Sequence, residues 1–245
     1  MELKVIAYAR NGHSDKFGIP RQSRDGSPIL TRIVFEPEYS VAEAFRGIEG
    51  FSHLWLIWGF SEVLKDDVQC TKGDGQRTKE WSPTVRPPRL GGNKRMGVFA
   101  TRSPFRPNPV GLSSVKLEKV VYNHSESGRM ELIVSGADVL DGTPIYDIKP
   151  YLSFTDSHPE AQNGFAEETK NRTLPVVFDP RLYFEMPSRR LRDALEAEIC
   201  YILSQDPRPG YQDDPGREYK MDYAGYGVTF TVENGTVFVK NVQKL

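Results

Sequence analysis

The sequence predicts a mainly β protein, in which a small single-sheet β-barrel precedes a smaller α+β unit. Up to about residue 153 the apolar residues form short runs of strand length with little helical periodicity, which is typical of an antiparallel barrel or sandwich. A helical pattern and a strong hairpin signal appear only after that point. We therefore expect two domains, residues 1–153 and residues 154–245.

The first part contains a series of expected strands and one expected short helix. Residues 3–9 and 29–35 are alternating or β-branched, and the nearly continuous apolar run 51–60 is typical of a strand covered on both faces. Ser40 opens a capping box that predicts a helix ending at Gly50. Further strands are expected at residues 96–101, 112–122, 130–135 and 145–148.

The second part combines a helix with a hairpin. Ser188 precedes apolar residues at helical spacing and predicts a helix through Ser204, which is ended by two prolines in the segment 205–211. Asn234-Gly235 lies between two alternating apolar runs, and this is the strongest short-range signal for a β-hairpin. This part is therefore expected to be an α+β unit.

Composition limits the class of protein and the cellular compartment to be expected. The chain has 245 residues, of which 38% are hydrophobic and 27% charged, so it can bury a core and stay in solution. No apolar run approaches the roughly 20 residues that span a bilayer, and the N-terminus lacks the apolar region of a signal peptide. Cys70 and Cys200 stand far apart in unrelated contexts, which fits a reducing compartment. We expect a cytoplasmic protein with no membrane segment.

Common cofactor motifs are absent from the sequence. There is neither a Walker loop nor a G-x-G-x-x-G after a strand, so the usual evidence for a P-loop or Rossmann site is missing. The four histidines stand in separate places, and no set of His, Cys or carboxylate residues has metal-ligand spacing. We therefore expect no metal.

The most unusual stretch of the chain runs from Trp81 to Leu117. It contains seven Lys or Arg residues, six prolines and four glycines, but no Asp or Glu. Proline fixes the backbone and glycine permits unusual dihedral angles, so the cations stand on a specified, irregular path. Such a loop is suited to holding phosphate, carboxylate or a nucleic-acid backbone, although an ordinary basic surface loop is the alternative. Its cations are Arg86, Arg89, Lys94, Arg95, Arg102, Arg106 and Lys116.

Three segments together indicate a ligand site. They are Pro20–Gln22, the run 102–109, and Asp138–Pro150, in which Asp-Gly-Thr-Pro has turn chemistry flanked by carboxylates. The last segment is equally consistent with a plain tight turn between strands. Phe105, between two arginines, either stacks on a base or packs into the barrel. The residues alone indicate an anionic or nucleotide-like ligand and do not specify a reaction.

The same segments resemble a known family. Residues 83–113, 49–60 and 138–152, with the C-terminal 205–211, closely resemble the TsaA-like (YaeB-like) family, whose bacterial members look like tRNA (adenine N6)-methyltransferases. Only residues 65–79 depart, being longer and more polar. The resemblance implies a barrel that binds S-adenosylmethionine and methylates N6 of threonylcarbamoyladenosine beside the anticodon of a threonine tRNA. It also implies a homodimer with sites near the subunit interface.

The resemblance also implies roles for individual residues. Arg102 is expected to bind the cofactor's carboxylate or a tRNA phosphate. Asp138 or Asp141 is expected to bind the cofactor's ammonium group. Asp141 or Asp147 is expected to be the general base, unless the acceptor N–H is acidic enough to need none. The expected cofactor-binding residues are Pro20, Arg21, Gln22, His53, Leu54, Arg102, Leu112, Leu140, Asp141, Gly142 and Thr143. The anticodon stem-loop would be held by Arg86, Arg89, Lys94, Arg95 and Arg106, with Phe105 or Tyr146 against a splayed base.

Two other functions remain open from the sequence. One is a methyltransferase of the same fold that acts on a small molecule, for which no cationic surface is needed. The other is a non-enzymatic RNA-binding barrel, which requires RNA binding with a steep salt dependence and no affinity for S-adenosylmethionine.

Overall fold

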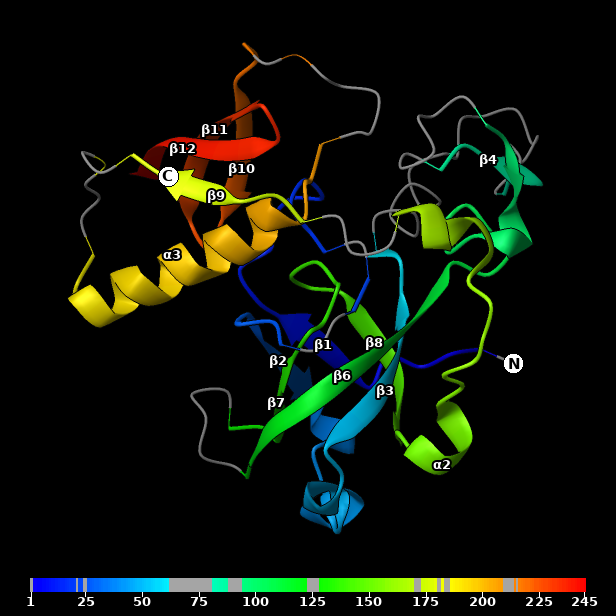
Figure 1. Ribbon diagram of the computed structural model, residues 1–245. Helices are drawn as coiled ribbons and strands as arrows, with labels where there is room; N and C mark the ends of the chain where they lie inside the picture. The colour runs from blue at the N-terminus through cyan, green and yellow to red at the C-terminus, as the bar shows by residue number, and fades with distance from the viewer. Residues whose placement is uncertain are drawn as a thin grey trace, which may run out of the picture.

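Six antiparallel strands close into the barrel that the sequence predicts (Figure 1). Their order is β1-β2-β7-β6-β3-β8, and pairing of β8 with β1 closes the ring. The mainly β fold class is confirmed. The barrel strands are β1 (Ala7–Arg10), β2 (Leu30–Phe35), β3 (His53–Gly59), β6 (Val110–Val121), β7 (Glu131–Ser135) and β8 (Pro144–Pro150). This computed structural model describes residues 2–20, 22–23, 26–61, 81–87, 94–122, 128–169, 173–179, 182, 186–208, 214 and 216–245.

The barrel encloses one apolar core because alternate side chains of its strands point inward. In β2, for example, Thr31, Ile33 and Phe35 are buried while Leu30 and Arg32 are exposed. The ring of Phe35 meets that of Phe45 edge to face, with centroids 4.6 Å apart. The inward residues of the six strands form a single hydrophobic cluster, so the rims and outer face remain for ligand contacts.

The second unit is a four-stranded sheet in the order β10-β11-β12-β9, with α3 packed against it (Figure 1). Ser188 accepts a hydrogen bond from the Leu191 N–H at 3.3 Å, so the predicted helix cap is confirmed. Asn234 and Gly235 have φ of 50° and 73° between β11 and β12, so the predicted hairpin is confirmed. The elements are β9 (Val176–Phe178), α3 (Arg189–Ser204), β10 (Tyr219–Tyr223), β11 (Tyr226–Glu233) and β12 (Thr236–Lys244).

One segment of the N-terminal part joins the two units. The described residues between β1 and β2 (11–20, 22–23 and 26–29), here called the linking segment, leave the barrel after β1 and include Phe17 and Ile29, which pack on the second core. Phe17 stacks on Phe230 with ring centroids 6.3 Å apart. The carbonyl oxygen of Gly12 accepts a 2.8 Å hydrogen bond from the N–H of Ala224. The barrel and the second sheet are therefore held together through this segment.

Two predicted elements of the first part are wrong in form. Residues 40–50 do not make an α-helix but two 3₁₀ helices, Ala42–Phe45 and Ile48–Gly50. The reason is a tertiary partner: the Ser40 hydroxyl accepts a hydrogen bond from the Met130 N–H at 2.6 Å instead of capping a helix. The strand predicted at 96–101 is only two residues long, because a 3₁₀ helix, Val98–Ala100, follows at once.

A basic arm extends from the barrel, and α2 lies near its other end (Figure 1). In the arm, β4 (Thr84–Val85) pairs with β5 (Met96–Gly97), and we use the name basic arm for residues 81–87 and 94–109. The short helix α2 (Ser153–Asp156) follows β8, and a 3₁₀ helix occupies Gly164–Thr169. No helix within the described ranges is long and apolar enough to cross a membrane.

Candidate functional site

A buried chain of hydrogen bonds starts on β3 and ends at a carboxylate. The indole N–H of Trp58 donates to the hydroxyl oxygen of Ser113 at 2.8 Å, and the Ser113 hydroxyl donates to the carboxylate of Asp138. Trp58 fits here because β6 carries Gly111 beside it, where any Cβ would collide with the indole ring. The chain fixes one face of the half-buried Asp138 side chain.

The other side of Asp138 faces two of the expected cofactor segments. A backbone hydrogen bond from Ser23 and the positive charge of Arg102 both favour its ionised form. Burial opposes them and dominates, so the pKa of Asp138 lies above the usual value of an aspartate. The guanidinium of Arg102 in turn donates to the side-chain oxygen of Gln22. We call Gln22, Ser23, Arg102, Ser113 and Asp138 the Asp138 cluster.

The expected cofactor turn lies three residues further along the chain. Gly142 has φ of 78°, a left-handed conformation that favours glycine. The amide groups of this turn are already used: Asp141 N–H donates to the carbonyl of His13, Gly142 N–H to Ala9, and Thr143 N–H to Leu140. The carbonyl oxygens of Leu140 and Thr143 also accept hydrogen bonds, from Thr143 and Ala9, so ligand contacts of the turn fall to its side chains and to the carbonyl oxygens of Asp141 and Gly142.

Both carboxylates expected to act as general base are held by neighbours. Asp141 accepts hydrogen bonds from the backbone N–H of Asn11 at 3.1 Å and from the Arg10 guanidinium at 3.4 Å. Asp147 pairs with Lys149 at 3.0 Å and accepts a 2.9 Å hydrogen bond from the backbone N–H of Ile148. Each side chain is still more than two-fifths exposed, so both remain predictions as proton acceptors.

Not all expected cofactor residues lie together in the chain. His53 begins β3, whereas Ser113 of the Asp138 cluster pairs with Leu56, roughly 10 Å further along the strand at about 3.3 Å per residue. The His53 ring hydrogen-bonds to the Ser52 hydroxyl and lies near Tyr151. Leu54 is fully buried in the barrel core, whereas Leu112 is 56% exposed on the outside. Pro20 is buried beside Gln22, and Arg21 and Arg89 lie outside the described residues.

A β-bulge turns Tyr146 out of the barrel ladder. On β3, Ile57 pairs with Asp147 and Trp58 with Ile145, so Tyr146 is the extra residue on β8. Its ring covers Gly59, where a side chain would collide with it. Burial, followed by the proximity of Tyr8, raises the pKa of Tyr146. The bulge thus places an aromatic ring at the rim of the barrel.

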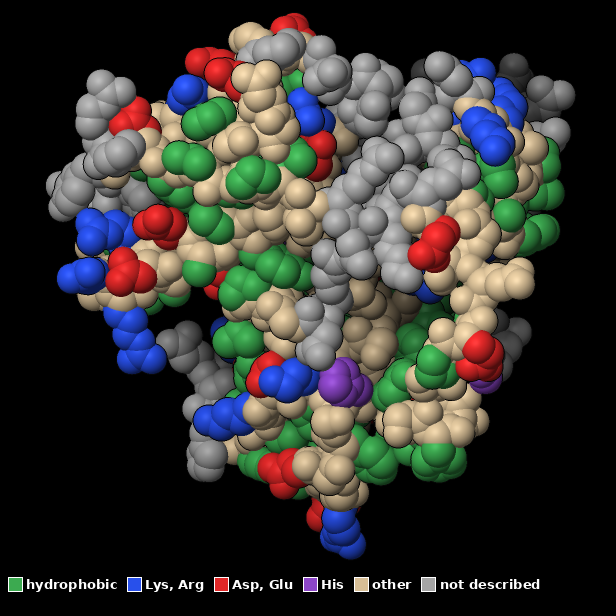
Figure 2. Space-filling model, viewed as in Figure 1, with side chains coloured by type: hydrophobic (Ala, Val, Ile, Leu, Met, Phe, Trp, Pro, Cys, Tyr) green, Lys and Arg blue, Asp and Glu red, His purple; other side chains and the backbone are tan. Residues whose placement is uncertain are grey.

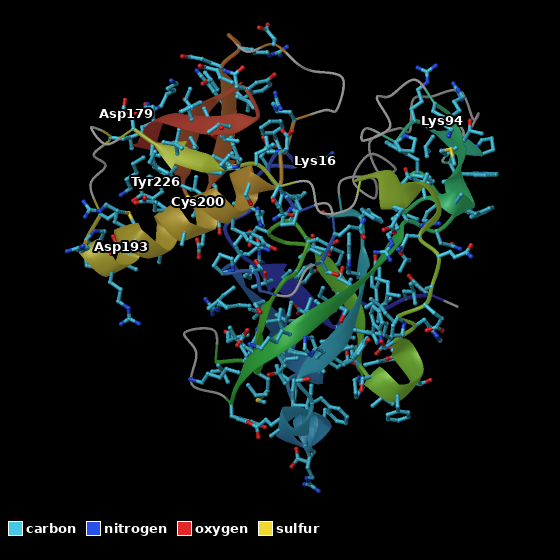
Figure 3. All side chains as sticks on the ribbon, viewed as in Figure 1. Lys16, Lys94, Asp179, Asp193, Cys200 and Tyr226 are labelled. Carbon is cyan, nitrogen blue, oxygen red and sulfur yellow. The ribbon has the colours of Figure 1, made fainter. Side chains whose placement is uncertain are left out.

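The basic arm presents cations and aromatic rings together. Arg86, Lys94 and Arg95 are exposed on it, and Arg95 donates to the Thr84 hydroxyl at 2.8 Å. Figure 2 shows Lys and Arg side chains gathered over the arm, and Lys94 lies on its outer part in Figure 3. The expected tRNA contact Arg106 is partly exposed. Phe105 is 55% exposed, so it does not pack into the barrel core.

Comparisons with known proteins agree with this geometry. The family description "tRNA-methyltransferase O N-terminal domain" matches residues 8–157, and "TrmO C-terminal domain" matches residues 171–245. The chain belongs to the tRNA-methyltransferase O family. The predicted family resemblance is therefore confirmed, while the boundary at residue 153 remains a prediction.

Individual relatives of this family match almost end to end. The tRNA (adenine(37)-N6)-methyltransferase of Escherichia coli is 37% identical over 94% of this chain and 93% of its own length. The enzyme of that name from Eikenella corrodens is 44% identical over 78% of this chain and 97% of its own length. The crystal structure of TrmO from Pseudomonas aeruginosa matches with a TM-score of 0.75 and 29% identity, covering 100% of this chain and 97% of that one.

The Asp138 cluster has the chemistry that this family's cofactor requires. S-adenosylmethionine carries a carboxylate, an ammonium group and a sulfonium. The exposed Arg102 can pair with a carboxylate, and Asp138 and Asp141 can accept from an ammonium. Across the part of the chain that is described, no group of three or more His, Cys, Asp or Glu residues could hold a metal ion. The residues present thus fit the cofactor.

Sequence reasoning missed Ser23, next to the predicted Gln22, and two residues on the barrel strands. Ser113 and Trp58 lie in segments that were predicted only to be barrel strands. Trp58 lies 55 residues before its partner Ser113, and Ser113 lies 25 residues before its partner Asp138. No local motif marks such a contact. The one available signal was a buried-strand serine and a tryptophan, both of which need hydrogen-bond partners when buried.

Proposed function

We propose that the protein transfers the methyl group of S-adenosylmethionine to N6 of adenosine 37 in threonine tRNA, with the threonylcarbamoyl-modified nucleoside as substrate. One observation supports this most directly: Gln22, Arg102 and Asp138 come together at one end of the barrel of a chain that belongs to this enzyme family. Three segments that are far apart in the sequence thus form one polar site. The relatives named above carry the activity on adenosine 37 in their names.

The donor would be held by opposite charges. Arg102 binds its carboxylate, and Asp138 or Asp141 accepts hydrogen bonds from its ammonium group. The turn 140–143 contributes the carbonyl oxygens of Asp141 and Gly142, since the N–H groups of Asp141, Gly142 and Thr143 are occupied. When bound, the cofactor supplies a methyl group on a positively charged sulfur, which reacts by in-line displacement. Alignment by these residues is therefore a large part of catalysis, with effective molarities of about 10⁵ M available to well-oriented groups.

The acceptor nitrogen has to lose a proton. We propose Asp141 or Asp147 as its acceptor, because both are exposed carboxylates on the same barrel end as Tyr146 or next to it in the chain. Tyr146, placed by the bulge, is suited to packing against the splayed base. If an Asp141→Asn and Asp147→Asn double variant retained full activity at neutral pH, no general base would be needed.

The basic arm would grip the anticodon stem-loop. Its cations stand in a window without any acidic residue, so the arm attracts a polyanion and does not neutralise itself. Phe105 stands among them and is exposed for stacking on an unpaired base. Binding would be salt-dependent, whereas cofactor binding at the Asp138 cluster would depend on salt only weakly.

We also propose a cytoplasmic homodimer. Support comes from the separation of His53 from the Asp138 cluster, which begins about 10 Å further along β3. A second protomer that brought its His53 end to the Arg102 end of the first would complete the site. Sedimentation at equilibrium measures this: a single species with the mass of one chain would contradict the dimer.

The decisive assay is transfer of tritiated methyl from S-adenosylmethionine to threonine tRNA. We expect incorporation into tRNA that carries threonylcarbamoyladenosine and little into the same tRNA without that modification. Equal incorporation into both would refute the proposed substrate. Methylation of a small molecule in the absence of any tRNA requirement would favour the first alternative, and tRNA binding without cofactor affinity would favour the second.

A further inference from the structure

Asp138 lies just before the turn 140–143, at a point where three separate segments of the chain meet. It accepts hydrogen bonds from a strand residue, Ser113, and from the backbone of the linking segment at Ser23. It also faces the charge of Arg102. One carboxylate therefore ties together β6, the linking segment and the basic arm. Ser23 and Arg102 are 79 residues apart in the sequence, and Ser113 follows Arg102 after 11 more.

The contacts are arranged as a support for other residues. Trp58 orients the Ser113 hydroxyl by donating to its oxygen, so the hydroxyl proton is directed to Asp138. Arg102 is held from the other side by Gln22, next to Ser23. Loss of the negative charge would leave Arg102 with the Gln22 oxygen alone in this cluster and would free the Ser23 end of the linking segment.

We propose that Asp138 is the positioning residue of the donor site, which sets the course of the Gln22–Ser23 segment and the direction of Arg102 before the cofactor binds. This inference rests on the proposed function and on Arg102 as the partner of the cofactor's carboxylate. It differs from direct binding of the ammonium group, because Asp138 then acts through Arg102 and the Ser23 backbone. Preorganisation of this kind lowers the cost of ordering the site on binding.

Asp138 also gives the site a pH dependence. Because burial raises its pKa, protonation begins at a higher pH than for an ordinary aspartate. The protonated form no longer holds the charge of Arg102, which is the charged group that faces it. As the pH is lowered, cofactor affinity should therefore begin to fall at a higher pH than the titration of an ordinary aspartate would give.

The test compares Asp138→Asn with a matched control, Glu131→Gln. Glu131 is also a barrel carboxylate bound to an arginine: it accepts from Arg32 at 2.8 and 2.9 Å, and it lies on β7 away from the cluster. By calorimetry, Asp138→Asn should bind S-adenosylhomocysteine at least about tenfold more weakly and with a flat pH profile. Glu131→Gln should lose stability but keep affinity within about twofold.

Direct ammonium binding is separated from positioning by a second ligand. The deamino analogue of S-adenosylhomocysteine keeps the carboxylate and lacks the ammonium group. An equal loss of affinity for both ligands in Asp138→Asn supports positioning, whereas a loss confined to the amino form overturns it. Ser113→Ala, which removes one donor and keeps the charge, should give a smaller loss in the same direction and serves if Asp138→Asn does not fold.

Measurements on the wild-type protein distinguish failure of the proposed function from failure of the positioning role. If the wild-type protein neither binds S-adenosylhomocysteine nor methylates tRNA, the proposed function fails. If it does both and Asp138→Asn matches it in affinity and pH profile, only the positioning role is overturned. In the methylation assay, the positioning role predicts a raised KM for S-adenosylmethionine with a smaller change in kcat at saturation.

Discussion

The barrel end that holds the Asp138 cluster, which is the proposed donor end, and the basic arm are built in opposite ways. At the donor end, polar side chains are engaged with one another: Trp58 with Ser113, Ser113 with Asp138, and Arg102 with Gln22. In the arm, a ladder of two residues per strand carries exposed cations. The first arrangement is fixed before any ligand arrives, whereas the second presents its cations to solvent.

This difference matches the two ligands. A small cofactor reacts fastest in a site whose groups are already in position, because alignment controls the rate. A folded RNA is held by many phosphate contacts, each weak and screened by salt, so an adaptable surface is sufficient. Substitutions at the donor end should therefore act on cofactor affinity, and substitutions in the arm on tRNA affinity and its salt dependence.

The largest expected effect is at Arg102. Arg102→Ala should weaken cofactor binding by about 2–3 kcal/mol, or about 30- to 150-fold, because a charge-assisted pair with the carboxylate is lost. Calorimetry with S-adenosylhomocysteine measures it, and Arg102→Lys should recover part of the affinity. Unchanged cofactor affinity together with weaker tRNA binding would assign Arg102 to a tRNA phosphate, like the other cations of the basic arm.

His13 lies between the donor end and the second unit, and its titration gives the second-largest expected effect, a loss of stability at low pH. It is 2% exposed, its ring lies against Tyr223, and its carbonyl accepts from Asp141 N–H. Burial lowers its pKa from 6.5 to about 4. Its contribution to stability is thus complete above about pH 6.5 and is lost as the pH falls toward 4.

At pH 5 this loss should amount to about 2 kcal/mol of unfolding free energy relative to pH 7. Urea unfolding at the two pH values measures it, with His13→Gln as the variant that cannot take up the proton. The variant should show a pH dependence smaller by that amount. The same pH dependence in both proteins would show that His13 is not buried in its neutral form.

In the arm, the double substitution Arg86→Ala and Arg106→Ala should raise the KM for tRNA about tenfold, or about 1.4 kcal/mol, and leave cofactor affinity unchanged. Filter binding at several salt concentrations should give a shallower salt slope. The double substitution Arg46→Ala and Arg190→Ala is the matched control, since both are exposed arginines outside the arm. An equal effect in the control would mean that only net charge matters.

The smallest expected effect concerns α3, which lies outside both the donor end and the basic arm. Ser188→Ala removes the cap of α3 and should cost about 1 kcal/mol of stability, visible as a lower Tm. Neither cofactor affinity nor tRNA affinity should change at a temperature where the protein is folded. A drop in either would show that α3 takes part in ligand binding.

Local signals in the sequence were sufficient for much of the fold. The barrel strands were predicted from alternation and β-branched residues, and Ser188 and Asn234-Gly235 predicted the helix and the hairpin because each feature is decided within a few residues. The capping box at Ser40 failed because a distant amide, that of Met130, competed for the same hydroxyl. The strands β9 and β10 were not predicted from the sequence.

The site was predictable only where a family motif covered it. Arg102, Gln22 and the turn 140–143 came from the resemblance, but the relation among them did not. Which carboxylate supports Arg102 depends on the register of β3 and β6 and on the path of the linking segment. That path is set by apolar contacts with β10 and β11, more than 190 residues away in the sequence.

The course of the linking segment has a consequence for the growing chain. All barrel strands have been synthesised by Pro150, but Phe17 and Gly18 find their partners Phe230 and Met221 only about 70 to 80 residues later. Until then Gln22 and Ser23 lack their anchor. A ribosome-bound chain with a finished barrel is therefore expected to be unable to capture its methyl donor, so that competence for catalysis arises near the end of translation.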